Sequence, residues 1–85
     1  MTVTKYTGIS NNTNYSVPMQ NGVYLLSRTD SNKYASYIKG YVENGVLKEI
    51  NPYSGITVSY TNGTLTVNKG TINIGTNDLY FFVCD

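Results

Sequence analysis

A short alternating segment around an Asn-Gly pair constrains this fold more than any other part of the sequence. In Ile56–Val67 (I-T-V-S-Y-T-N-G-T-L-T-V), apolar and small polar residues alternate on both sides of Asn62-Gly63. Asn-Gly favours the type I′ turn of a two-residue β-hairpin, because both residues accept positive φ. The predicted register pairs Thr61 with Thr64, Tyr60 with Leu65 and Val58 with Val67. This register puts the apolar side chains on one face and a ladder of hydroxyl side chains on the other.

The rest of the chain repeats this pattern of short alternating segments separated by turn residues. No window has apolar residues at helical spacing, so no helix is predicted. Turn signals recur roughly every eight to twelve residues, which is typical of a β-sandwich or small barrel. The predicted fold is all-β: a small antiparallel β-sandwich of about seven or eight short strands joined by Asn-Gly type hairpins. Residues 1–14 are expected to form an N-terminal arm or edge strand, and residues 15–85 a single domain.

The expected strands are bounded by these turn residues. Pro18 predicts a sheet edge or the start of a strand, because proline donates no ladder hydrogen bond. Outside the central hairpin, strands are predicted over Thr2–Thr7, Tyr15–Gln20, Val23–Thr29, Tyr34–Val42, Val46–Ile50, Thr71–Ile74 and Asp78–Cys84, with Asn-Gly turns at 21, 44 and 62.

Composition excludes several function classes. A domain of 85 residues is marginally stable without disulfides, metals or oligomerisation. One cysteine and no histidine exclude an internal disulfide and argue against a zinc site. The five lysines and one arginine are scattered and give no basic stripe for nucleic acid. No apolar run is long enough to cross a bilayer, and no signal-peptide pattern follows Met1. We expect no metal, no cofactor, no nucleic acid and no membrane insertion; oligomerisation remains.

Two strands are apolar on both faces, which points to that oligomer. Val23–Leu26 and Leu79–Cys84 do not alternate, although a strand with one wet face should. One face serves the core, and a second copy of the chain is the most economical cover for the other. The alternative is a central strand whose outer side is covered by loops. The sequence does not say which face is core, so the candidate interface residues are Leu79, Tyr80, Phe81, Phe82 and Val83.

Catalysis is not expected from these residues. Without histidine, no Ser-His or Cys-His pair is possible. Glu43 and Glu49 flank one hairpin, but solvated turn carboxylates are far commoner than a glycosidase pair. Cys84 has no cation placed beside it, and we expect a buried, unreactive thiol.

Binding is better supported than catalysis. If Ile38 and Val42 face the core, alternation sends Tyr37, Lys39 and Tyr41 to the opposite face. Such a face suits stacking on sugar rings, anchoring of a protein partner, or a subunit interface. If Val42 opposes Leu47, Ile50 lies on the same side as these tyrosines, which favours the interface. The candidate ligand-binding residues are Tyr37, Lys39 and Tyr41, together with Asn51, Tyr53 and Ser54 of the longest well-defined turn.

The order of these pieces resembles one known class of protein. A Val-Pro segment leads through Asn-Gly into an apolar strand (Val17–Leu26), a Tyr-rich strand follows (Tyr34–Val42), and then comes the hairpin sequence Gly55–Asn68. This arrangement is similar to the small all-β tip domains at the C-terminal ends of bacteriophage tail fibres and receptor-binding proteins, roughly from Tyr15 to Val83. The resemblance implies a β-sandwich that trimerises on the virion surface, contacts other virion proteins and adheres to a host-surface glycan or protein. No binding residue carries over from the family.

The tip domains of that class follow a long stalk, whereas here only residues 1–14 precede the resemblance. We therefore expect either an excised tip or a complete small virion protein, for which a capsid decoration (cement) protein or head fibre is the natural alternative. A bacterial carbohydrate-binding module is an alternative from another class, and an enzyme is the most distant one.

Overall fold

The structure is a computed structural model that describes residues 1–29, 35–51, 55–72 and 78–85. These residues form eight β-strands and no helix, which confirms the all-β prediction. The strands are β1 (Thr2–Tyr6), β2 (Asn14–Pro18), β3 (Gly22–Thr29), β4 (Ala35–Glu43), β5 (Val46–Asn51), β6 (Thr57–Thr61), β7 (Thr64–Asn68) and β8 (Leu79–Cys84).

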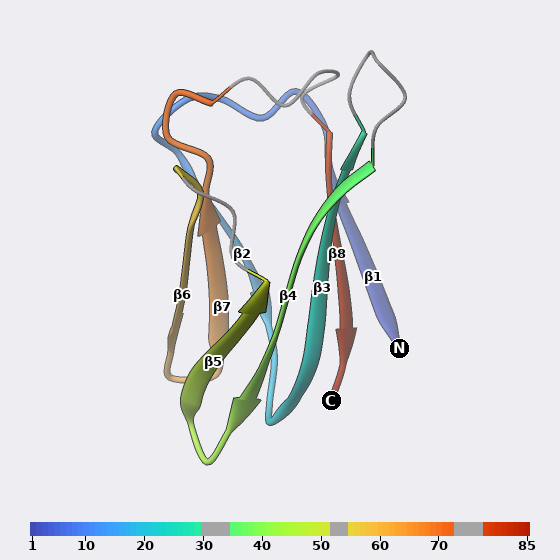
Figure 1. Ribbon diagram of the computed structural model, residues 1–85, viewed down its shortest axis with the longest axis vertical. Helices are drawn as coiled ribbons and strands as arrows, with labels where there is room; N and C mark the ends of the chain where they lie inside the picture. The colour runs from blue at the N-terminus through green and yellow to red at the C-terminus, as the bar shows by residue number, and fades with distance from the viewer. Residues whose placement is uncertain (30–34, 52–54, 73–77) are drawn as a thin grey trace.

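The strands form two antiparallel sheets that pack face to face (Figure 1). The larger sheet has the order β1-β8-β3-β4-β5, and the smaller sheet has the order β2-β7-β6. β1 is therefore an edge strand of the larger sheet. β2 is an edge strand of the smaller one, which is one of the two positions predicted for Pro18.

The central hairpin has the predicted register. In β6 and β7, Thr61 pairs with Thr64, Tyr60 with Leu65 and Val58 with Val67. Asn62 and Gly63 have φ of 49° and 78°, and Asn44 and Gly45 of the β4–β5 hairpin have 52° and 75°. Both Asn-Gly pairs therefore adopt the positive φ that a type I′ turn requires.

Two sequence predictions about connections differ from the structure. Asn21-Gly22 does not close a hairpin, because β2 and β3 belong to different sheets. Here the chain crosses between layers, and a Cβ at Gly22 would lie 2.3 Å from the carbonyl oxygen of Cys84. The predicted strand Thr71–Ile74 is also wrong in its first half: residues 71 and 72 lie in a turn beyond β7, and the remainder falls outside the described residues.

The core lies between the sheets and contains apolar side chains from both. Tyrosines add hydrogen bonds across it: the Tyr6 hydroxyl donates to the carbonyl of Ser16 (2.6 Å), and the Tyr60 hydroxyl donates to that of Met19 (2.9 Å). The core residues are Ile9, Val17, Met19, Tyr24, Leu26, Ile38, Val42, Val58, Leu65, Val67, Leu79, Phe81 and Val83.

A buried lysine forms hydrogen bonds that join two loops at one end of the sandwich. Lys69 is 5% exposed, and its ammonium group donates to the side-chain oxygen of Asn11 and to the carbonyl of Ile72 (2.9 Å). The Asn12 amide donates to the Gly70 carbonyl beside it (2.9 Å). These hydrogen bonds join the loop after β1 to the turn after β7 and compensate for burial of the charge.

Tyr24 is the one core side chain in the described residues whose buried polar atom lacks a hydrogen-bond partner. It is fully buried in β3 opposite Gly40 of β4. A Cβ at Gly40 would lie 2.4 Å from the Tyr24 hydroxyl, so only glycine leaves room for the phenol there. Burial raises the pKa of Tyr24 to about 12, and the charge of Glu49 adds to the rise.

We expect Tyr24→Phe to stabilise the protein by about 1–2 kcal/mol, because it removes a desolvated hydroxyl that has no partner. It should also remove a stability loss at high pH. The phenol ionises near pH 10 when exposed and near pH 12 when folded, so the folded state binds this proton more tightly. The contribution of this proton to the free energy of unfolding is complete below pH 10 and disappears as the pH rises towards 12. The wild-type protein should lose on the order of 2 kcal/mol of stability over this interval, and Tyr24→Phe should not.

Urea unfolding of both proteins between pH 7 and 12 measures the two effects together. The two proteins are otherwise identical in sequence, so the difference between the two curves isolates Tyr24. Equal stability at pH 7 with parallel pH profiles would show that the hydroxyl is satisfied by water.

Candidate functional site: the outer face of the larger sheet

The alternation of β8 settles which face of the last strand is core. Leu79, Phe81 and Val83 are buried against the smaller sheet, whereas Tyr80 and Phe82 are half-buried on the opposite, outer face. The predicted interface set therefore divides. Three of its members, Leu79, Phe81 and Val83, are core residues. Only Tyr80 and Phe82 are available to a partner.

Strand pairing extends the outer face on both sides of β8. Phe82 lies between Val3 of β1 and Leu25 of β3, and Leu25 is followed by Lys39 of β4. A second row runs from Cys84 through Val23 and Tyr41 to Lys48 of β5. Cross-strand partners share a face, so these strands form one continuous surface. We call the outer apolar face the set Val3, Val23, Leu25, Tyr41, Tyr80 and Phe82.

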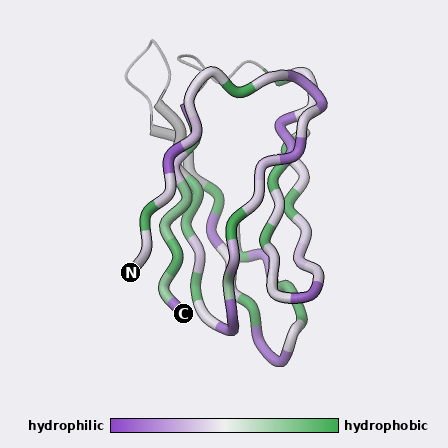
Figure 2. The backbone as a smooth tube through the Cα atoms, turned by 180° about the vertical axis from the view of Figure 1, so that it is seen from behind, coloured by the Kyte–Doolittle hydropathy of each residue, from purple (hydrophilic) through white to green (hydrophobic). Residues whose placement is uncertain are grey.

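The apolar side chains of this face are left open to solvent. Val3 and Val23 are 52% and 44% exposed, and their larger neighbours on this face are half-buried. The rings of Tyr80 and Phe82 stack with centroids 6.3 Å apart. Figure 2 shows that β8 is hydrophobic along nearly its whole length. An apolar surface that spans four strands is typical of an interaction site rather than of a solvated sheet face.

Lysines border this face on both sides. Lys5 of β1 lies over the Tyr80 ring, 5.2 Å from its centroid, and 3.9 Å from a carboxylate oxygen of Asp78. Hydrogen bonding to Tyr80, and then the charges of Tyr80 and Asp78, raise the pKa of Lys5. Lys39 and Lys48 are exposed on the β4–β5 side. Long lysine stems can cover apolar surface while the charge stays hydrated.

The predicted ligand-binding residues are only partly described. Lys39 and Tyr41 lie on the outer face as predicted, because Ile38 and Val42 are buried. The backbone register places Tyr37 opposite Ser27, but its side chain and that of Asn51 fall outside the described part. Tyr53 and Ser54 also fall outside it.

Two further expectations concern Ile50 and Cys84. Val42 opposes Leu47 as predicted, and the partners of β4 and β5 then shift between Lys39 and Gly40, which makes Ile50 the extra residue of a β-bulge. The Ile50 side chain is 55% exposed, in agreement with the expectation that it lies outside the core. The expectation of a buried Cys84 is wrong, because Cys84 is exposed beside Val23.

The acids of the β4–β5 hairpin do not form a pair. Glu49 pairs with Gly40, which lies on the same, inward face of β4 as the buried Ile38 and Val42. Glu43 pairs with Val46 and is one position beyond Val42 along β4. Alternation therefore puts the two carboxylates on opposite faces. Within the described ranges, no three His, Cys, Asp or Glu side chains gather as metal ligands, and no helix is long and apolar enough to span a membrane.

Comparison with protein-family models, curated proteins and solved structures finds no match for this chain. The outer face is therefore interpreted from its own chemistry. Sequence reasoning identified residues on β4 and β8 but missed Val3 and Lys5. They join the face only through the pairing of β1 with β8, between opposite ends of the chain.

Proposed function

We propose that this protein is a non-catalytic structural module of a bacteriophage particle that associates with copies of itself through the outer apolar face. The observation that carries the proposal is the continuous apolar surface across the larger sheet, centred on Leu25 and Phe82. The phage setting comes from the resemblance of Val17–Leu26 and Gly55–Asn68 to tail-fibre tip domains, and a homotrimeric tip that adheres to the host is the function we propose within it.

The outer side of the larger sheet is large enough to take part in an interface. Five strands about 4.8 Å apart and six residues at about 3.3 Å each cover roughly 20 Å in both directions, a flat area of about 400 Å². This is about half of the ~800 Å² per partner of a standard interface, so a partner must cover the whole side of the sheet and neighbouring surface as well. The outer side of the smaller sheet offers a contrast, because Thr57, Ser59, Thr61 and Thr64 are exposed there and need no cover.

The charges on the face favour a second candidate. Among the described residues of this side of the sheet, Lys5, Lys39 and Lys48 accompany two acids, Glu43 and Asp78, and Asp78 lies beside Lys5. A surface with more lysine than acid suits an acidic patch on another virion protein. In that case the chain is a capsid decoration protein or head fibre, which docks as a single copy.

The test is light scattering on the purified protein, on Phe82→Asp and on the matched control Ser59→Asp. Both substitutions add the same charge to an outward strand position, one on each sheet. We expect an oligomer that Phe82→Asp weakens by about 30-fold or more, because truncation of a central anchor typically costs at least about 2 kcal/mol. The control should stay assembled.

Circular dichroism should show that both variants are folded. A stable monomer at micromolar concentration would contradict self-association and leave docking on another virion protein. An oligomer unaffected by Phe82→Asp would place the interface elsewhere.

A further inference from the structure

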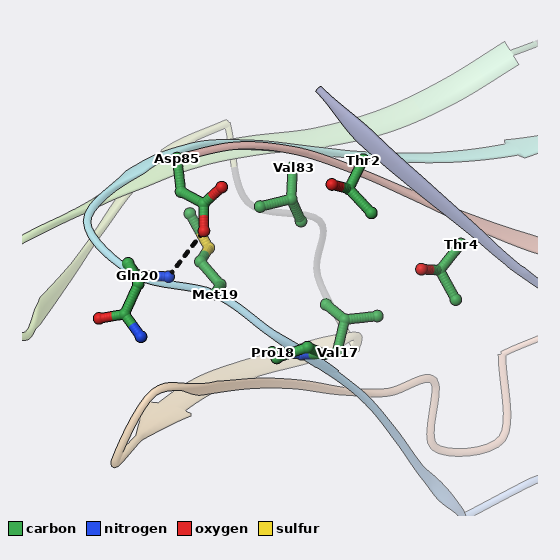
Figure 3. Close-up of a pocket in the computed structure, with 8 residues that line it drawn as sticks. All are labelled: Thr2, Thr4, Val17, Pro18, Met19, Gln20, Val83 and Asp85. Carbon is green, nitrogen blue, oxygen red and sulfur yellow. Dashed lines mark hydrogen bonds between the residues drawn. The ribbon is translucent and has the colours of Figure 1, made fainter.

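A pocket of about 240 Å³ lies where the sandwich is open, between β1 at the edge of the larger sheet and β2 at the edge of the smaller one (Figure 3). Its residues come from both layers and from both ends of the chain. Thr2 and Thr4 belong to β1, Val17 to β2 and Val83 to β8, and Asp85 follows β8. No element of the described chain pairs with the open side of β1 or β2.

The polar groups of the pocket lie at its two ends. At one end, a carboxylate oxygen of Asp85 accepts a hydrogen bond from the backbone amide of Gln20 (3.1 Å). At the other end are the hydroxyl groups of Thr2 and Thr4, whose oxygens point back towards Val83 in Figure 3. Among the described residues, the second carboxylate oxygen and the two hydroxyls have no hydrogen-bond partner, so a ligand could bind between them.

The middle of the pocket is apolar. Val17 and Val83 are each only 4% exposed, and with Met19 they supply a floor of methyl groups. The lining includes neither lysine nor arginine, and Asp85 is its only charged side chain. This charge disfavours an anionic ligand. A fitting molecule carries no negative charge, has hydroxyls at opposite edges and presents a C–H face to the methyl groups.

We propose that this pocket binds a single neutral sugar ring, with the Asp85 carboxylate accepting from ring hydroxyls and Thr2 and Thr4 binding the opposite edge. The volume agrees with one ring, since it is below the ~300 Å³ at which drug-sized sites begin. This inference rests on the proposed function as an adhesive module and gives it a ligand class and a location. Thr2 and Thr4 alternate with the outward Val3, so the pocket stays open when the outer face is covered.

The test is NMR titration of the ¹⁵N-labelled full chain with methyl glycosides of glucose, galactose, mannose and N-acetylglucosamine. At least one should shift the amides of Thr2, Thr4, Val83 and Asp85 together. Thr4→Val keeps the shape and removes a hydroxyl, and should weaken binding about 2- to 10-fold. Asp85→Asn keeps an acceptor for the Gln20 amide but removes the charge, and should weaken binding about tenfold or more. The control Thr61→Val, on the exposed side of the smaller sheet, should change nothing.

No shifts with any glycoside, or shifts that both pocket variants leave unchanged, would overturn the proposal. Shifts that appear in Phe82→Asp but not in the assembled protein would show that a neighbouring copy covers the pocket, and would overturn its role as a binding site of the assembly. A wild-type protein that is monomeric yet binds through Asp85 would support the pocket while refuting self-association, so the two proposals fail separately.

Discussion

Phe81→Asp is expected to abolish folding, although Phe82→Asp, one residue later, leaves the fold intact. Phe81 is fully buried, lies opposite Leu26, and packs edge-on against Tyr6 with ring centroids 5.8 Å apart. Loss of a core phenylalanine typically costs about 3–5 kcal/mol. An unpaired carboxylate among these side chains adds several more. The sum exceeds what a small domain has to spare, since total stability is about 5–15 kcal/mol and lowest for short chains.

Circular dichroism and ¹H–¹⁵N spectra of the two variants decide this prediction. Phe81→Asp should give collapsed amide dispersion at every temperature, whereas Phe82→Asp should retain the dispersion of the wild type. Phe81→Leu serves as the control for loss of the ring alone and should remain folded. The reverse order of the two aspartate variants would mean that the faces of β8 are assigned the wrong way round.

Gly40→Ala is expected to destabilise the protein by about 3 kcal/mol, the upper part of the range for overpacking. The new Cβ would lie 2.4 Å from the Tyr24 hydroxyl and 2.6 Å from the carbonyl oxygen of Lys48. Neither atom can move freely, because the tyrosine is fully enclosed and the carbonyl belongs to the paired strand β5. A β-bulge lies next to this contact, between Lys39 and Gly40.

Urea denaturation of Gly40→Ala, Tyr24→Leu and the double variant measures the clash as a coupling energy. Tyr24→Leu removes the atoms nearest to the new methyl group, so the double variant should be more stable than the two single losses predict. Additive losses would assign the clash to the Lys48 carbonyl. A loss below about 1 kcal/mol in Gly40→Ala would show that the sheet yields at this point.

The parts of the fold predicted from sequence are those set by neighbouring residues. The hairpin around Asn62-Gly63 carries its own register, because the turn fixes the pairing and alternation fixes the face. Asn21-Gly22 gives the same local signal but joins two sheets, because a turn residue does not determine which layer the next strand enters. The pairing of β8 with β1 and β3 depends on contacts between distant segments and leaves no local pattern.

The candidate site was predicted in fragments for the same reason. Tyr41 was assigned to a ligand surface and Phe82 to an interface, yet β3 brings both strands into one face. The β-bulge at Ile50 was not predicted, because alternation assumes that the residues of paired strands match one for one. The pocket was missed because it lies between edge strands of different sheets, where no sequence pattern aligns Thr4 with Asp85.

The position of β8 has a consequence for biosynthesis. It is the last of the eight strands in chain order but lies inside the larger sheet, between β1 and β3. During translation the Asn-Gly hairpins can close as soon as they leave the ribosome, whereas β1 has no neighbour in its sheet until β8 emerges. Until then the edge of β3, with Leu25 and Leu26, is unpaired and open to aggregation. The nascent chain is therefore most vulnerable in the interval between synthesis of β3 and release of the C-terminal strand.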